Sequence, residues 1–293
     1  MRFRRFALLA AGLLLMSLLP SAALRENETA GSWGDGCFQA QHRKPVRPAP
    51  TDPPPEPEGP VSRYLQQPNG RQALLERYEA WAAEHPEAEP AQVVLQVNMD
   101  LDRPFYTRIQ TVSEPDSLAV LVNKYNILPD GYAPELEVLG AGYGGGSMRP
   151  EAAQAFRAMA DAAGAEGVSL RSVSAYRSYQ LQKSAYNGYL RNASQAYVDT
   201  FSARPGHSEH QTGLAVDINV ATRKANFEKT PAFAWLQEHC AEYGFILRYL
   251  EDKQDITGYR FEPWHYRYVG EEAARACMDQ GLAYEEYIAL LPN

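Results

Sequence analysis

Two short segments that lie far apart in the chain restrict its fold more than any other feature. Residues 208–217 read SEHQTGLAVD and include His210 and Asp217, and residues 262–265 read EPWH. Together they offer two imidazoles and one carboxylate to a metal ion, with the carboxylate of Glu262 to spare. A hydrolytic zinc site has this inventory of three protein ligands, one open position for water and a general base. A fold that uses the inventory must bring the two segments together.

The first segment runs into a predicted strand. Between residues 214 and 220 every second residue is apolar, as in a strand with one buried face. Asp217 falls on the opposite face. Gly213, just before the strand, allows a tight turn through which His210 can fold back towards Asp217. A plainer interpretation stays open on these residues alone, namely a half-buried strand with a solvated aspartate after a loop with a surface histidine.

The second segment must be irregular if its side chains are to share one site. Residues 261–269 are too aromatic for an ordinary loop, and Pro263 argues against a helix. The helical H-E-x-x-H arrangement is absent. In a regular strand Glu262 and His265 would face opposite sides. We therefore expect Glu262 on a bulge or irregular stretch and His265 on the strand that follows.

The two motifs, S-x-H-x6-D followed by E-P-W-H, resemble those of the zinc D-alanyl-D-alanine carboxypeptidases of the VanY type. That group is related to the VanX dipeptidases and shares its zinc fold with the hedgehog signalling domain. The resemblance extends from about Tyr64 to the C-terminus and implies an α+β fold, with a small antiparallel sheet flanked by helices. It also implies that His210, Asp217 and His265 bind Zn2+ and that Glu262 is the catalytic base.

The resemblance adds residues from the segment before the first motif. Residues 168–176 predict a strand that delivers Arg177 at its end, and a helix is expected from about 179 to 191. In the similar enzymes an arginine at this strand end polarises the scissile carbonyl. The helix that follows helps to line the pocket, here with Gln182 and Tyr189 on one face. The alternative for Arg177 is a surface residue that caps a neighbouring helix.

The remaining pocket predictions concern the substrate's terminal carboxylate. Ser208 and Tyr249 are candidates to hold this carboxylate, and Trp264 is a candidate for the pocket wall. His207 is a rival metal ligand, but only His210 fits the spacing to the aspartate.

The N-terminal part of the chain predicts export. Residues 1–23 contain three arginines, an apolar run and a Ser-Ala-Ala end, which is the layout of a signal peptide, although an uncleaved anchor stays open. Residues 24–60 are proline-rich and polar, as in a disordered linker. Residues 61–293 are then the peptidase domain, with an N-terminal portion at 61–145 that packs on a zinc catalytic core at 146–293. The expected location is extracytoplasmic: the protein is either secreted or tethered to the outer face of the cytoplasmic membrane, near the cell wall.

Local patterns predict further elements within the domain. Residues 70–85 have the apolar spacing of an amphipathic helix, and the alternation over residues 93–97 predicts a strand. In an exported protein Cys240 and Cys277 are candidates for a disulfide bond, with two separately buried thiols as the alternative, and Cys37 is the odd cysteine in the linker.

The charge of the chain restricts its partners. The formal net charge is −8, and removal of residues 1–23 would bring it to −11. An acidic chain without a basic cluster is a poor candidate for nucleic-acid binding. We expect a monomer that contacts the membrane only through the possible N-terminal anchor.

The resemblance implies one function ahead of its alternatives. The chain is expected to release the terminal D-Ala from peptidoglycan stem peptides, as a zinc-dependent D,D-carboxypeptidase that uses metal-activated water. An L,D-carboxypeptidase acting on the stem tetrapeptide would use the same metal ligands. A non-catalytic, zinc-stabilised module that binds cell-wall peptide or another protein also stays open.

Overall fold

The computed structural model describes residues 62–292, all within one compact unit. The predicted signal or anchor at residues 1–23, the predicted linker at 24–60 and Cys37 lie outside the described residues. Among residues 62–292, no helix combines the length and the apolar character that a membrane span requires.

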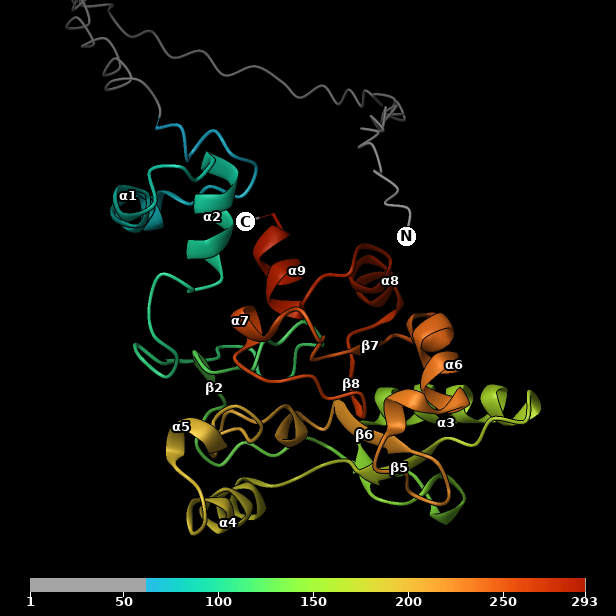
Figure 1. Ribbon diagram of the computed structural model, residues 1–293. Helices are drawn as coiled ribbons and strands as arrows, with labels where there is room; N and C mark the ends of the chain where they lie inside the picture. The colour runs from blue at the N-terminus through green and yellow to red at the C-terminus, as the bar shows by residue number, and fades with distance from the viewer. Residues whose placement is uncertain (1–61, 293) are drawn as a thin grey trace, which may run out of the picture. The chain divides into compact units, whose positions relative to one another are not determined.

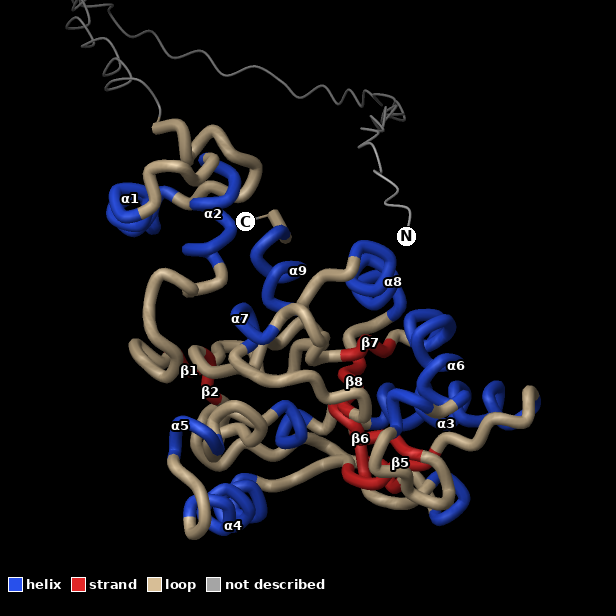
Figure 2. The backbone as a smooth tube through the Cα atoms, in the orientation of Figure 1, coloured by secondary structure: helices blue, strands red, loops and turns tan. Residues whose placement is uncertain are grey.

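A small antiparallel sheet organises this unit (Figure 2). Its four strands lie in the order β5-β6-β8-β7, with every neighbouring pair antiparallel. Their bounds are Arg171–Ser174 for β5, Ala215–Asn219 for β6, Phe245–Leu247 for β7 and His265–Tyr268 for β8. The predicted α+β class, with a small antiparallel sheet flanked by helices, is confirmed.

Two helices cover the apolar face of β6. They are α3 (Pro150–Ala165) and α6 (Pro231–His239), and both lie beside β5 and β6 in Figure 1. Each begins with proline at its first position, where the missing N–H costs no intrahelical hydrogen bond. In the main hydrophobic core Val216 and Ile218 of β6 lie with Phe156 of α3 and Leu236 of α6, all fully buried. This face of β6 is therefore committed to packing, and only its other face is available for chemistry.

Five further α-helices follow Arg177 within the described residues. They are α4 (Tyr179–Leu190), α5 (Gln195–Val198), α7 (Gln254–Thr257), α8 (Glu271–Gln280) and α9 (Tyr284–Leu290). The expected helix after Arg177 is thus confirmed as α4. The Ser178 hydroxyl caps it by accepting a hydrogen bond from the backbone N–H of Leu181 at 3.3 Å.

The N-terminal portion contains a helical pair and two small strand pairs. Strand β1 (Gln110–Thr111) is parallel to β2 (Asn126–Ile127), and β3 (Glu137–Val138) is antiparallel to β4 (Ser147–Met148). The main core takes Val122 and Leu128 from this portion. The division of the domain at residue 145 stays a prediction.

One predicted strand of this portion is wrong. The expected helix over residues 70–85 is present as α1 (Leu75–Glu84), but residues 93–97 belong to a second helix, α2 (Pro90–Asn98). Alternation selects Val93, Leu95 and Val97, whereas the structure buries Val93, Val94 and Val97. These three share one helical face and pack against Tyr78 of α1. A short apolar run fits both the two-residue period of a strand and the 3.6-residue period of a helix. Packing against the preceding helix decided between the two structures.

The candidate disulfide is also wrong, because both thiols are free and buried. Cys240 lies in the main core, while Cys277 on α8 lies in a second cluster with Ile246, Val269 and Tyr284. Burial raises the pKa of each thiol to about 12. The cysteines therefore serve as small apolar side chains.

Candidate metal centre and active site

The register of two neighbouring strands places Asp217 beside His265. In the antiparallel pair β6–β8 these residues are direct partners, so their side chains lie on the same face of the sheet. That face is opposite to the apolar face that packs on α3 and α6. The backbone N–H of His265 donates to the carbonyl of Glu262 at 3.0 Å, which closes a turn just before β8 begins. The irregular segment that we expected around Glu262 is therefore confirmed.

A one-turn 3-10 helix, Glu209–Thr212, brings His210 to the same place. It ends at Gly213, whose φ of +71° is a left-handed conformation that glycine adopts without strain. A Cβ at Gly213 would lie 3.2 Å from the backbone nitrogen of Arg149, a tight contact that a small shift of this backbone would have to relieve. His210 is 4% exposed, and its Nδ1 donates to the carbonyl of Ala175 at 2.7 Å.

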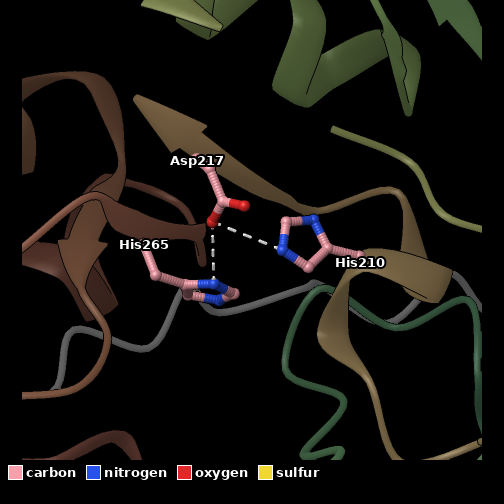
Figure 3. A group of neighbouring side chains, drawn as sticks. All are labelled: His210, Asp217 and His265. Carbon is pink, nitrogen blue, oxygen red and sulfur yellow. Dashed lines mark ion pairs between the residues drawn. The ribbon is translucent and has the colours of Figure 1, made fainter. Parts of the chain in front are cut away.

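The three side chains predicted as metal ligands converge on one point (Figure 3). Asp217 Oδ1 lies 3.4 Å from Nε2 of His210 and 3.2 Å from Nδ1 of His265. One ligand atom from each residue lies within 4.8 Å of the other two. The plainer interpretation, a solvated aspartate and a separate surface histidine, is excluded.

The hydrogen bonds around these side chains fit a cation. The backbone carbonyl can only accept, so Nδ1 of His210 carries the proton and Nε2 keeps its lone pair in the neutral ring. On His265, Nε2 lies 3.3 Å from a carboxylate oxygen of Glu209, which leaves the lone pair on Nδ1. Both lone pairs face Asp217 Oδ1, which is buried and has no hydrogen-bond partner among the described residues. A divalent cation at this point would satisfy all three atoms.

The pKa values of the two histidines shift in opposite directions. Burial lowers the pKa of His210 and favours its neutral form. Burial would also lower the pKa of His265, but the adjacent carboxylates of Asp217 and Glu209 outweigh burial and raise the pKa to about 9. Two carboxylates thus hold a positive charge at His265, and a metal ion would compete with the proton for this position.

Glu262 lies next to the ligands as the predicted base. Its side chain is buried at 7% exposure, and Oε2 is 4.0 Å from Nδ1 of His265. Burial raises the pKa of Glu262 to about 7, with the nearby charge of His265 acting in the opposite direction. A carboxylate whose pKa is near neutrality can both take and return a proton at physiological pH.

Arg177 also points into the site, held by two side chains. Its Nη1 donates to Gln182 Oε1 at 2.9 Å and its Nη2 to Ser174 Oγ at 2.8 Å, while Nη2 lies 3.8 Å from Asp217 Oδ2. The amide nitrogen of Gln182 in turn donates to the carbonyl of Ala203 at 2.7 Å. Since both ends of this amide are engaged, Gln182 positions Arg177. Its contact with substrate stays a prediction.

These residues border one cavity of about 560 Å³. The predicted pocket residues all line it, namely Gln182, Tyr189, Ser208, Tyr249 and Trp264. Tyr189 is 47% exposed at its edge, whereas Tyr249 is buried, with its ring 4.9 Å from that of His265.

The sequence interpretation missed two further arginines of this cavity. Arg223 and Arg260 line it, and neither has an ion pair within residues 62–292. Together with Arg177 they give the cavity three guanidinium groups, which suit a substrate that carries carboxylates. Lone arginines in loops leave no sequence pattern by which to find them.

Glu209 within the first motif and His207 just before it have contacts that the sequence did not reveal. Glu209 lies between Ser208 and His210, is 2% exposed, and contacts His265. Burial would raise its pKa, but Arg248 and Arg267 hold it well below the ordinary value. His207 is not among the converging residues. Its Nδ1 lies 2.7 Å from the carbonyl of Asn123.

Three comparisons with known proteins give consistent matches. The family model VanY, described as D-alanyl-D-alanine carboxypeptidase, matches residues 145–271. YodJ of Bacillus subtilis (strain 168), itself named a carboxypeptidase only provisionally, is 40% identical over 196 residues, which cover 61% of this chain and 70% of YodJ.

Two solved structures are similar at 38% identity. The LdcB LD-carboxypeptidase has a TM-score of 0.59 and is matched over 92% of its chain and 63% of this one. A mutant of the vancomycin-resistance D,D-pentapeptidase VanY, solved in complex with Zn(II), has a TM-score of 0.53 and is matched over 99% of its chain and 59% of this one.

Proposed function

This chain belongs to the VanY family of D-alanyl-D-alanine carboxypeptidases, and on that premise we propose that it is a zinc-dependent D,D-carboxypeptidase acting on peptidoglycan stem peptides. Its substrate would be the stem pentapeptide, from which it removes the terminal D-Ala. The observation that carries the proposal is the convergence of His210, Asp217 and His265 next to the buried carboxylate of Glu262. A purely structural zinc site requires no such extra carboxylate.

Each group of the site has a separate role in the proposed peptide hydrolysis. A zinc ion held by His210, Asp217 and His265 would supply a Lewis acid, which lowers the pKa of nearby water and polarises a carbonyl. Glu262 takes a proton from the attacking water and later returns it to the leaving amine. Arg177, held in place by Gln182, donates hydrogen bonds to the carbonyl oxygen as negative charge develops there.

The cavity is also suited to bind the free end of a peptide. Ser208 and Tyr249 line it and are proposed to hold the carboxylate of the departing D-Ala, with Trp264 as a wall. The stem peptide lies outside the cytoplasmic membrane, so the proposal includes an extracytoplasmic address, which the apolar run of residues 1–23 supports.

One observation favours L,D-carboxypeptidase activity on the stem tetrapeptide as the second candidate. LdcB, the LD-carboxypeptidase, is among the similar structures.

Mass spectrometry of synthetic stems distinguishes the two candidates. The zinc-loaded protein is incubated with the tetrapeptide and the pentapeptide, in parallel with a chelator-treated sample and with Glu262→Gln as a matched inactive control. Loss of one residue from the pentapeptide alone supports D,D-carboxypeptidase activity, and loss from the tetrapeptide alone supports the second candidate. If zinc is bound but neither stem is shortened, both are wrong and the non-catalytic module becomes the better account.

A further inference from the structure

Glu209 is the most enclosed carboxylate in contact with the candidate ligands. Its side chain has no accessible surface, although its neighbours Ser208 and His210 belong to the cavity wall. Oε1 accepts from Nε of Arg248 at 2.8 Å and from Nη1 of Arg267 at 3.0 Å. The second oxygen, Oε2, faces Nε2 of His265 at 3.3 Å. The two oxygens of one carboxylate thus face different partners.

The two arginines are themselves fixed in place. Nη1 and Nη2 of Arg248 donate to the two carboxylate oxygens of Glu285 at 2.8 and 2.7 Å. Nη2 of Arg267 donates to the carbonyls of Leu118 and Val120 at 3.1 and 2.9 Å. Both arginines are completely buried, so neither can turn towards water. Oε1 of Glu209 is therefore held between two guanidinium groups, and only Oε2 can accept a hydrogen bond from His265.

We propose that Glu209 is a positioning residue that selects Nδ1 of His265 as the ligand atom. A ring nitrogen that binds a metal cannot carry a proton, so ligation through Nδ1 requires the proton on Nε2. Oε2 of Glu209 can only accept, and it therefore holds the ring in this tautomer. It also fixes the plane of the ring so that Nδ1 faces Asp217. The role rests on the proposed function, since it concerns the metal site of that enzyme.

The variant Glu209→Gln has nearly the same shape as the wild-type side chain, but it should favour the opposite tautomer of His265. A glutamine amide has one accepting oxygen and one donating nitrogen. Arg248 and Arg267 both donate towards the position of Oε1, so the amide oxygen of Glu209→Gln stays there. The NH2 group must then face Nε2 of His265, where it donates. That contact favours the proton on Nδ1, which is the tautomer that cannot bind the metal through Nδ1.

Glu285 provides a matched control. It is also 2% exposed and bound to Arg248 by two hydrogen bonds, but it makes no contact with His265. The variant Glu285→Gln removes one negative charge from the same buried network. A general loss of stability from that network would therefore affect both variants, whereas a change of tautomer affects only Glu209→Gln.

The experiment measures zinc affinity by competition with a chromophoric chelator, for the wild type and both glutamine variants, with circular dichroism to check folding. We expect Glu209→Gln to bind zinc about 10- to 100-fold more weakly than the wild type. Glu285→Gln should stay within about threefold. Wild-type affinity in Glu209→Gln, or an equal loss in both variants, would overturn the proposal.

A second measurement on the wild type does not depend on any variant. In ¹⁵N NMR spectra of the zinc-loaded protein, His265 should show a protonated Nε2 and a metal-bound Nδ1. A metal-bound Nε2 would overturn the proposal. The proposed function can fail independently of this role. If the protein binds zinc through Nδ1 of His265 but shortens no stem peptide, the proposed enzymatic activity is wrong, while the role of Glu209 is still supported.

Discussion

The two imidazoles of this site are oriented by the ring nitrogens that face away from the metal position. His210 donates to the carbonyl of Ala175, and His265 contacts the carboxylate of Glu209. Each contact assigns the proton to one nitrogen and leaves the other free for a cation. At the scale of single residues, the site therefore depends as much on the partners of its ligands as on the ligands themselves.

The pH dependence of catalysis should reflect Glu262. Burial raises its pKa to about 7, and a bound cation would lower it, so the acidic midpoint of kcat/KM should be at or below about 7. Below the midpoint Glu262 is protonated and cannot act as a base, so the rate falls as the pH falls. The measurement is D-Ala release from the preferred stem between pH 4.5 and 8.

Two variants test this assignment. Glu262→Gln should lower kcat by roughly 10²- to 10⁴-fold while the zinc content stays equal to that of the wild type. Glu251→Gln, an exposed residue in the loop after β7, should leave the rate and its midpoint unchanged. An acidic midpoint well above 7 would contradict the role of Glu262.

Gln182 should affect catalysis through Arg177. The variant Gln182→Ala removes a hydrogen bond to a charged group, which contributes about 1.5–3 kcal/mol, so kcat/KM should fall by about 10-fold or more. Zinc affinity should not change, since Gln182 contacts none of the three ligands. Gln180→Ala, on the exposed side of the same helix, is the control. Equal kcat/KM in the two variants would show that Arg177 needs no such support.

At the scale of elements, the pairing of β6 with β8 places the site. The register that pairs Asp217 with His265 also turns Val216 and Ile218 into the core. A shift by one residue would exchange the two faces and bury Asp217 among apolar side chains. The hydrophobic core therefore specifies the metal site, because the same alternation orients both faces of β6.

Gly213 should be needed both for stability and for metal binding. Gly213→Ala places a Cβ in a left-handed conformation and against the backbone of Arg149, so we expect a loss of about 2–4 kcal/mol in the free energy of unfolding. Gly281→Ala has a similar φ of +62° but open space around its Cβ, and should cost about 1–2 kcal/mol.

Urea unfolding of both glycine variants provides the measurement, with zinc affinity as a second readout. Only Gly213→Ala should lose zinc affinity, because Gly213 ends the turn that carries His210. The account is wrong if the two variants lose the same stability.

At the scale of the whole molecule, a buried charge network connects the site to the C-terminal helix. It runs from His265 through Glu209 and Arg248 to Glu285 on α9, and each of these residues is at most 4% exposed. Buried charges without partners are costly, so each member depends on the others. The last helix of the domain is thereby joined to a site whose ligands come from β6, β8 and the turn before β6.

Zinc should therefore stabilise the whole described domain. The ligands come from separate segments, and binding to the folded state alone adds about 2.7 kcal/mol when free zinc is 100 times its Kd. Differential scanning calorimetry should show a higher Tm with zinc than after chelation. His265→Ala should remove this difference. If chelated and zinc-loaded wild type melt at the same temperature, the site does not hold zinc in the folded protein.

The sequence alone determined features that depend on local spacing. The turn at Glu262, the apolar face of β6 and the helix after Arg177 follow from neighbouring residues, whose periodicity and turn chemistry are properties of short segments. The three metal ligands are predicted through the resemblance of the two motifs to a known family, and the β6–β8 register helps to bring them together. The tertiary structure decided what depends on contacts between distant segments. Residues 93–97 form a helix because α1 offers it an apolar face, and Cys240 and Cys277 stay apart because they pack in different clusters. Glu209 acquires its partners only when β7, β8 and α9 assemble around it, since hydrogen bonds and ion pairs between remote residues leave no periodic trace in the chain.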